Sequence, residues 1–260
     1  MKEGKRINNV LKEVLNSFWY DNLEKVIVNL HDYEYFFFDE DKFYPDIKNR
    51  FNAINNINFE NDFQVVIFGQ DPYPRKESAT GYAFWDGKIK SWEDKLSPSF
   101  RNIIKSLLIN KKLADEKTRI NELRKIIKEN NIPSPDDFFK NTIKNGVVWL
   151  NASFTHESKE TKVLNKHLKF WSPVIRKIID VLIEENKKKN NKIIFVFWGS
   201  KSLKLKNYIL KNHGEDNFKT YFLIENKHPM NESFHQKNSF EEIEKIIKRE
   251  GSSFYPFELS

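Results

Sequence analysis

Four polar residues with chemically useful side chains stand just after short apolar segments of the sequence. They are Asp71, Asn151, Ser200 and His228. A carboxylate can orient a water molecule and stabilise positive charge on a sugar ring during glycosidic cleavage. A side-chain amide matches the edge of a nucleobase, and a neutral imidazole can donate a hydrogen bond to an oxygen of the leaving group. On a basic protein, these groups predict cleavage of an N-glycosidic bond in nucleic acid.

The sequence lacks the motifs of several other enzyme classes. Ser200 is not part of a G-x-S-x-G motif, and the chain contains neither a G-x-x-x-x-G-K-[ST] phosphate loop nor G-x-G-x-x-G. It has no cysteine, which excludes disulfides, iron–sulfur clusters, cysteine nucleophiles and the zinc base deaminases. The histidines form no His-x-x-x-His pair. Metal binding is therefore disfavoured.

Short apolar segments alternate along the chain with segments of helical period. The apolar segments have the β-branched and aromatic composition of strands buried on both faces of a parallel sheet: VVIF at 65–68, VVWL at 147–150, IIFVFW at 193–198 and YFLI at 221–224. Helices are predicted at 98–109, 119–129, 163–185, 201–211 and 239–250. This alternation predicts an α/β sandwich, in which the polar residues after the strands converge on one cleft at their carboxyl ends.

Other local features concern domain organisation and segment ends. The absence of an internal repeat, a Gly/Ser linker or a break in composition predicts a single domain over residues 1–260. Ser239 is the expected N-cap of the last helix and Gly251 its stop. The polar segment EENKKKNNK at 184–192 is expected to be a solvated turn. The remaining histidines considered are expected at the surface: His156, His167, His213 and His235.

Composition and charge bound the class of protein and its partners. Of 260 residues, 39% are hydrophobic and 23 are phenylalanine, which indicates a folded chain. The net charge of +7 suits a polyanion such as nucleic acid, although a lysine- and asparagine-rich proteome would produce the same excess. No apolar run is long enough to cross a membrane, and the N-terminal segment lacks the apolar core of a signal peptide. We expect a soluble cytoplasmic monomer, associated with the nucleoid in a bacterium.

Six segments resemble, in order and at compatible spacing, the motifs of uracil-DNA glycosylases. GQDPYP at 69–74 resembles the G-Q-D-P-Y-[H] loop that activates water in this family. The others are GYAFW at 81–85, LSPSF at 96–100, GVVWLNASFT at 146–155, FWGS at 197–200 and KHP at 227–229. The resemblance spans roughly residues 17–258. It implies a three-layer α/β sandwich with a central four-stranded parallel sheet flanked by helices, and no cofactor.

The resemblance also implies an activity, which is the excision of uracil from single- or double-stranded DNA by base flipping, leaving an abasic site. Asp71 would orient or deprotonate the attacking water and offset the charge of the sugar cation. His228, uncharged, would donate a hydrogen bond to O2 of the departing uracil. Ser99, Gly199 and Ser200 would hold the phosphates that flank the flipped nucleotide.

Four further residues match the positions that contact the base in the family. Gln70 would contact the uracil carbonyls, Tyr73 would exclude a 5-methyl group, Phe84 would stack on the ring, and Asn151 would pair with its N3 and O4 edge. Three of these residues, and Ser200, also have an ordinary structural interpretation. Phe84 would suit the core and Tyr73 a turn, Asn151 would suit a turn cap, and Ser200 would suit the N-cap of the next helix.

The sequence departs from the family pattern in three places. Pro74 stands where the first motif usually has His, so a contact by that side chain is lost. Glu232 stands, by simple count, where the family inserts a Leu into the duplex, and Met230 or Phe234 is the possible apolar wedge in its place. Trp85 replaces the small residue that usually follows the stacking Phe.

These departures leave the chemical groups intact and alter the duplex-opening loop. We therefore expect uracil excision with a preference for unpaired over paired DNA. Two alternatives stay open from the sequence. One is a glycosylase of the same fold for another modified base, and the other is a catalytically weak DNA-binding or polymerase accessory protein.

Overall fold

Four parallel strands form one sheet at the centre of the protein. The computed structural model describes residues 2–31, 33–38, 42–157, 161–214 and 220–259. The strands are β1 (Phe63–Gly69), β2 (Val147–Asn151), β3 (Lys192–Trp198) and β4 (Tyr221–Asn226), in the order β2-β1-β3-β4. Every residue of β1 and β2 is buried, as expected for strands covered on both faces. All four predicted strands are therefore confirmed, and each is one to three residues longer than predicted.

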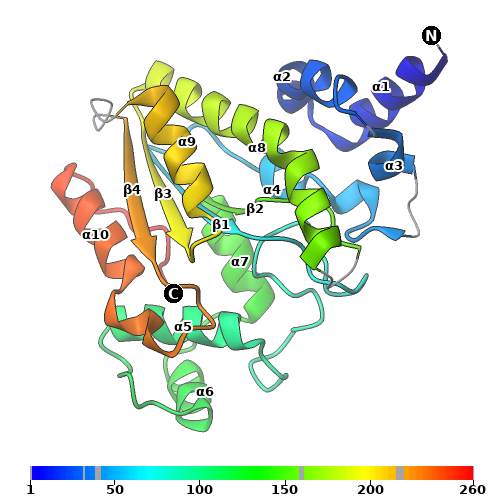
Figure 1. Cartoon of the computed structure of the whole chain (residues 1–260). Helices are drawn as coiled ribbons and strands as arrows, with labels where there is room; N and C mark the ends of the chain where they lie inside the picture. Colours follow the sequence, from blue (N-terminus) through cyan, green and yellow to red (C-terminus); the bar gives the residue numbers. More distant parts are fainter. Residues whose placement is uncertain (1, 32, 39–41, 158–160, 215–219, 260) are drawn as a thin grey trace.

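Helices cover both faces of the sheet and make the protein a three-layer sandwich (Figure 1). Alternate strand residues face two separate hydrophobic clusters: Val66 and Phe68 of β1 enter one, and Val65 and Ile67 the other. The first cluster packs against α1 (Lys2–Val14), α2 (Ser17–Val28), α8 (Thr161–Lys189) and α9 (Leu203–His213). The second packs against α5 (Pro98–Asn110), α6 (Ile120–Glu129), α7 (Pro135–Lys144) and α10 (Ser239–Arg249). The α/β sandwich prediction is confirmed.

Short helical segments complete the described chain. They are α3 (Tyr33–Phe38), η2 (Ile47–Asn49), α4 (Asn52–Asn55) and η4 (Glu232–Gln236). Helix α7 was not predicted, although Ser134 caps it through a hydrogen bond from the Asp137 N–H and Pro135 occupies its first turn. Among the described helices, none combines the length and the apolar character that a membrane crossing requires.

Two predicted segment ends are wrong. The N-cap of α10 is Asn238, whose side chain accepts from the Phe240 N–H at 3.0 Å, while the Ser239 hydroxyl accepts from the Trp198 indole at 3.0 Å. The predicted turn at 184–192 is helical up to Lys189. Its last turns stay helical because Asn186 is 1% exposed and donates to the Gln64 side chain at 2.9 Å, which ties the helix to β1. The predicted stop at Gly251 is confirmed by its φ of +86°.

Candidate functional site

The residues predicted to act together all follow the carboxyl ends of the strands. Asn151 is the last residue of β2 and lies in register with Gly69, the last residue of β1. The segments that follow β1 and β2 stay paired beyond the sheet, because the Ala152 N–H donates to Gly69 O at 3.0 Å and the Ser153 N–H donates to Gln70 O at 3.1 Å. The loop that carries the first motif therefore runs alongside the loop that follows Asn151.

The Asn151 amide is buried against the end of β1. A Cβ atom at Gly69 would lie 2.4 Å from Asn151 Oδ1 and 2.7 Å from Ala83 Cβ, so only glycine permits this close approach. Asn151 is 3% exposed, and its side chain has no hydrogen-bond partner among the described residues. It does not cap a turn. A buried amide that is free to form hydrogen bonds can recognise a polar edge brought to it.

The Asp71 carboxylate is held at both oxygens. Oδ1 accepts from the Gln70 Nε2 at 2.8 Å, and Oδ2 accepts from the His156 Nδ1 at 2.6 Å. The side chains of Asp71 and His156 are 18% and 5% exposed. The prediction that His156 lies at the surface is wrong, because the loop after β2 packs it beneath the loop after β1. Its position five residues beyond Asn151, on the same strand exit, was the available signal.

Tyr73 and Phe84 lie next to each other at the edge of the site. The Tyr73 hydroxyl donates to Phe84 O at 3.2 Å and lies 3.3 Å from Ser97 Oγ. Burial raises the pKa of Tyr73 to about 12, so the phenol is protonated at neutral pH. Phe84 has a φ of +63°, which is unfavourable for a bulky side chain. The structure holds its ring edge-to-face 5.4 Å from Trp198, the last residue of β3, and 6.2 Å from Trp149, in the middle of β2.

Trp85 packs against the second hydrophobic cluster. Its ring stacks on Phe139 of α7 at 5.1 Å with an interplanar angle of 3°. Its indole N–H donates to Asp136 at 2.9 Å. The replacement of a small residue by tryptophan therefore fills space against α7.

His228 packs directly against Gly199, the glycine that follows β3. Gly199 has a φ of +88°, and a Cβ atom there would lie 3.1 Å from His228 Cβ. The Met230 N–H donates to His228 Nδ1 at 3.2 Å, so in the neutral ring the proton sits on Nε2. Although the residue as a whole is exposed, desolvation of the ring and, secondarily, the positive charge of Lys201 lower the pKa of His228. The ring is thus a neutral hydrogen-bond donor.

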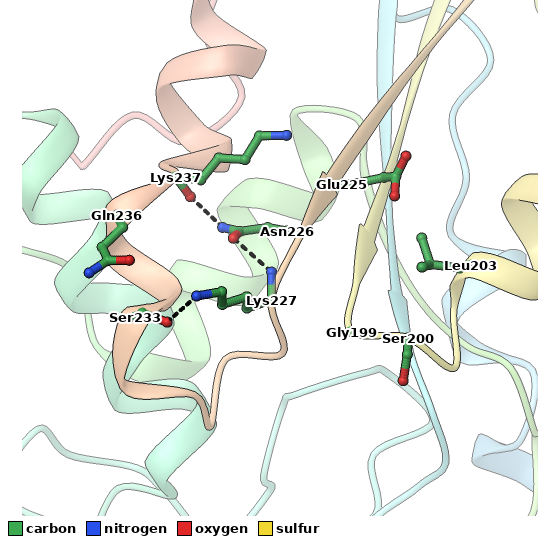
Figure 2. A pocket seen from close by; sticks show the side chains of 9 residues that line it. All are labelled: Gly199, Ser200, Leu203, Glu225, Asn226, Lys227, Ser233, Gln236 and Lys237. Carbon is green, nitrogen blue, oxygen red and sulfur yellow. Dashed lines mark hydrogen bonds between the residues drawn. The ribbon is translucent and has the colours of Figure 1, made fainter.

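Ser200 is exposed at the rim of a hollow between the ends of β3 and β4 (Figure 2). The hollow has a volume of about 460 Å³, and Lys227, Ser233 and Lys237 also line it. The Lys227 Nζ donates to Ser233 Oγ at 2.5 Å across one wall. The N-cap alternative for Ser200 is wrong, because α9 begins at Leu203 and follows Ser202.

Helix α5 brings the proline-rich motif to the same edge. Ser99 lies in its first turn, where backbone N–H groups and the helix dipole favour an anion. Asn102, one turn further, donates from Nδ2 to Pro229 O at 2.6 Å and ties the helix to the loop after His228. Ser99 is therefore brought towards the same side of the molecule as the loop after β4.

The two possible wedge residues have opposite environments. Met230 is 63% exposed at the tip of the loop after His228. Phe234 is 1% exposed and packs edge-to-face on Trp198 at 5.2 Å. The prediction of Phe234 as a wedge is wrong, because η4 turns its ring inward to the core. Glu232 begins η4 and is exposed.

Other histidines expected at the surface are also buried or partly buried. His167 is 1% exposed and bonds Thr155 Oγ1 at 2.8 Å, and His235 is 9% exposed. His213 is partly buried beside Asp180, with Nε2 2.7 Å from Oδ1. Among the described residues, no cluster of three or more His, Cys, Asp or Glu side chains could hold a metal ion.

Comparison with known proteins identifies the family of this chain. The sequence matches the model of the family described as the Uracil DNA glycosylase superfamily over residues 58–249. A uracil-DNA glycosylase of Borreliella burgdorferi is 29% identical over 258 residues, which are 97% of this chain and 99% of that protein. One from Buchnera aphidicola is 32% identical over 187 residues, 72% of this chain and 69% of that protein.

Solved structures share the fold. The wild-type UNG protein from Nitratifractor salsuginis has a TM-score of 0.70 and 21% identity, with 90% of this chain and 92% of that chain covered. Mimivirus uracil-DNA glycosylase has a TM-score of 0.66 and 20% identity, with 95% and 88% covered. Since the family match covers residues 58–249, which is most of the sequence, this chain belongs to the uracil DNA glycosylase superfamily.

Proposed function

We propose that this protein is a monofunctional uracil-DNA glycosylase, which hydrolyses the N-glycosidic bond of uracil in DNA and leaves an abasic site for base excision repair. The observation that carries the proposal is the gathering of Asp71, Asn151 and His228 at one edge of the sheet. Each side chain has the state that the reaction needs: a held carboxylate, an unpartnered amide and a neutral donor. Relatives that bear the name uracil-DNA glycosylase support it.

The base would be recognised after it leaves the duplex. Phe84 stacks on the extruded ring, and the Asn151 amide pairs with its N3 and O4 edge. Tyr73 stands against C5, so that a methyl group there would collide with it. Its hydrogen bonds to Phe84 O and Ser97 hold the phenol in place for this role. Gln70 offers the uracil carbonyls its backbone, because its side-chain amide is already bound to Asp71.

The chemical step breaks one bond and forms another. The C1′–N1 bond breaks with its electron pair moving to uracil, and water adds to C1′ of the resulting sugar cation. The Asp71 carboxylate stabilises that cation and accepts the proton of the water. His228 donates from Nε2 to O2, where the negative charge of the uracil anion gathers. Because the imidazole is neutral, it can give this hydrogen bond without an initial change of charge.

The DNA backbone would be held by the rim of the site. Ser99 lies at the N-terminal end of α5, and Gly199 and Ser200 lie at the end of β3. The net charge of +7 adds a salt-dependent attraction for phosphates. We further propose that the chain acts as one domain and as a monomer, in the cytoplasm, which gel filtration and fractionation would test.

The decisive experiment measures the release of free uracil from a uracil-containing oligonucleotide. Wild type should release it, and Asp71→Asn should be slower by about 10²- to 10³-fold, as when a charge-stabilising group is lost. Asp180→Asn is the matched control, because Asp180 also binds a histidine, His213 of α9, at 2.7 Å, but lies on helix α8, which covers the sheet. It should keep wild-type activity.

Two outcomes would contradict the proposal. DNA binding without any uracil release by wild type would favour the accessory-protein alternative. Release of a different modified base, but not uracil, in a product screen would favour the other glycosylase alternative.

A further inference from the structure

We propose that His156 is a positioning residue that fixes the orientation of the Asp71 carboxylate. The inference rests on the proposed function, since it assigns His156 a role in the same reaction. His156 would not touch the substrate. It would act through the carboxylate, in the way that the Asp of a Ser-His-Asp triad orients its His, with the two partners exchanged.

The contact is short and sheltered. His156 Nδ1 lies 2.6 Å from Asp71 Oδ2, and the imidazole is 5% exposed. The second oxygen is bound by the adjacent residue, Gln70, at 2.8 Å. A carboxylate bound at one oxygen can still rotate about its terminal bond, whereas one bound at both oxygens has a single orientation. Each oxygen keeps a further lone pair for water or for the sugar.

Hydrogen bonds fix the backbone of the segment that carries the His156 imidazole. The His156 N–H donates to Tyr44 O at 2.9 Å, and the Tyr44 N–H donates to His156 O at 2.9 Å. The preceding residue, Thr155, accepts from the Trp171 indole at 2.6 Å. The ring therefore projects toward Asp71 from a segment fixed on both sides, and it can serve as a reference point for the carboxylate.

The environment of Nε2 indicates which form of the ring is present. Nε2 is buried and has no hydrogen-bond partner among the described residues. A doubly protonated ring would bury an N–H group without an acceptor, which costs free energy. The neutral Nδ1–H form fits the site, and it leaves the full negative charge on Asp71. That charge is what the proposed sugar cation requires.

The position of His156 also bears on a departure noted in the first motif. The family usually has His after the motif tyrosine, and this chain has Pro74 there. An imidazole nevertheless stands beside Asp71, and it comes from the loop after β2, 85 positions away. Nothing in the spacing of the first motif shows this, and the role follows from the contact alone.

A pair of substitutions separates positioning from simple packing. His156→Asn keeps an N–H donor near the place of Nδ1, whereas His156→Leu fills the space without one. We expect His156→Leu to lower kcat by about 10- to 100-fold, the range for a misaligned catalytic group, with KM unchanged within about 2-fold. His156→Asn should restore most of kcat. The matched control is His213→Leu, which removes the other His–Asp contact and should leave both constants unchanged.

Several kinetic outcomes would overturn the inference while wild type stays active. They are a His156→Leu variant with wild-type kcat, equal losses in both His156 variants, or a loss in KM alone. If wild type itself releases no uracil, the proposed function fails instead. The hydrogen bond from His156 to Asp71 can then be tested by a second measurement, which requires neither activity nor a folded His156→Leu variant.

That second measurement is ¹⁵N NMR of wild-type protein with labelled histidines. We expect one ring to show a protonated Nδ1 with a downfield proton that is absent from His156→Asn and shifted in Asp71→Ala. An Nε2-protonated His156, or a signal indifferent to Asp71→Ala, would overturn the proposal.

Discussion

At the scale of single residues, burial decides the charge of the histidines around the site. Desolvation lowers the pKa of His228 and of His167, and it lowers the pKa of His235 to about 4. The pKa shift is large at His235, which is 9% exposed and whose Nδ1 has no partner among the described residues, whereas Glu157 offsets part of the desolvation of the more deeply buried His167. The nearby positive charge of Lys105 adds to the shift. These rings are neutral at pH 7, which suits His228 and has a consequence for stability at His235.

The consequence is a loss of stability in mild acid. A folded-state pKa of about 4, below the usual 6.5, means that the unfolded chain binds more protons between these pH values. The free energy of unfolding should therefore fall as the pH drops from 7 to 5, and His235 should contribute about 1–2 kcal/mol of that fall. His235→Leu should remove this contribution. Urea unfolding of wild type and His235→Leu at pH 7 and pH 5 measures the contribution. An equal fall in the free energy of unfolding of the two proteins would contradict the prediction.

At the scale of elements, the strand ends approach the loops so closely that side chains are excluded from two positions. Gly69 leaves room for Asn151 and Ala83, and Gly199 leaves room for His228. The two glycines differ in their backbone, because Gly199 has a φ of +88° that an L-residue rarely adopts. The sheet therefore sets the position of the amide and of the imidazole through glycine contacts as well as through strand order.

Gly199→Ala should lower activity through His228. The new Cβ would lie 3.1 Å from His228 Cβ and would push the ring by a few tenths of an ångström. We expect kcat for uracil release to fall about 10-fold or more. Gly251→Ala is the matched control, since its φ is +86° and nothing lies within 4 Å of the added Cβ. Both variants should lose about 1 kcal/mol of stability from backbone strain. Equal activity of the two variants would rule out an effect of Gly199→Ala on His228.

At the scale of the whole molecule, we propose that the net charge and the loop after β4 decide which DNA is accepted. The excess of 44 Lys and Arg over 37 Asp and Glu favours any nucleic acid. Selectivity depends on what the exposed loop can insert into a duplex. Met230 at its tip is exposed, Phe234 is in the core, and Glu232 carries a charge that DNA repels. We therefore propose that the flexible apolar side chain of Met230 takes the place of the family's Leu.

Unpaired uracil should accordingly be excised faster than paired uracil. Met230→Ala should slow excision from duplex DNA several-fold and leave excision from single strands nearly unchanged, because only the duplex must be opened. Leu113→Ala is the control, since Leu113 is also exposed, at 37%, but follows the far end of α5. A fluorogenic oligonucleotide assay measures all three proteins on both substrates. Faster cleavage of the paired substrate by wild type would contradict the preference.

The sequence by itself determined the four strands, half of the described α-helices (α5, α6, α8, α9 and α10) and the polar residues at the strand ends. Continuous apolar runs report burial on both faces, and periodicity reports an amphipathic helix, so both signals are local. The motif order carried the family resemblance for the same reason, because GQDPYP and its companions are contiguous in the chain. Asp71, Asn151 and His228 could be named from such signals.

Only the tertiary structure decided which loops meet. His156 reaches Asp71 because β2 pairs with β1. No local pattern in the sequence predicts the order of the strands in the sheet. Phe234 is turned into the core by η4, and the end of α8 stays helical because Asn186 bonds a residue of β1. These outcomes depend on contacts between residues far apart in sequence. Such contacts contribute to stability only after the sheet has formed and has brought the residues together.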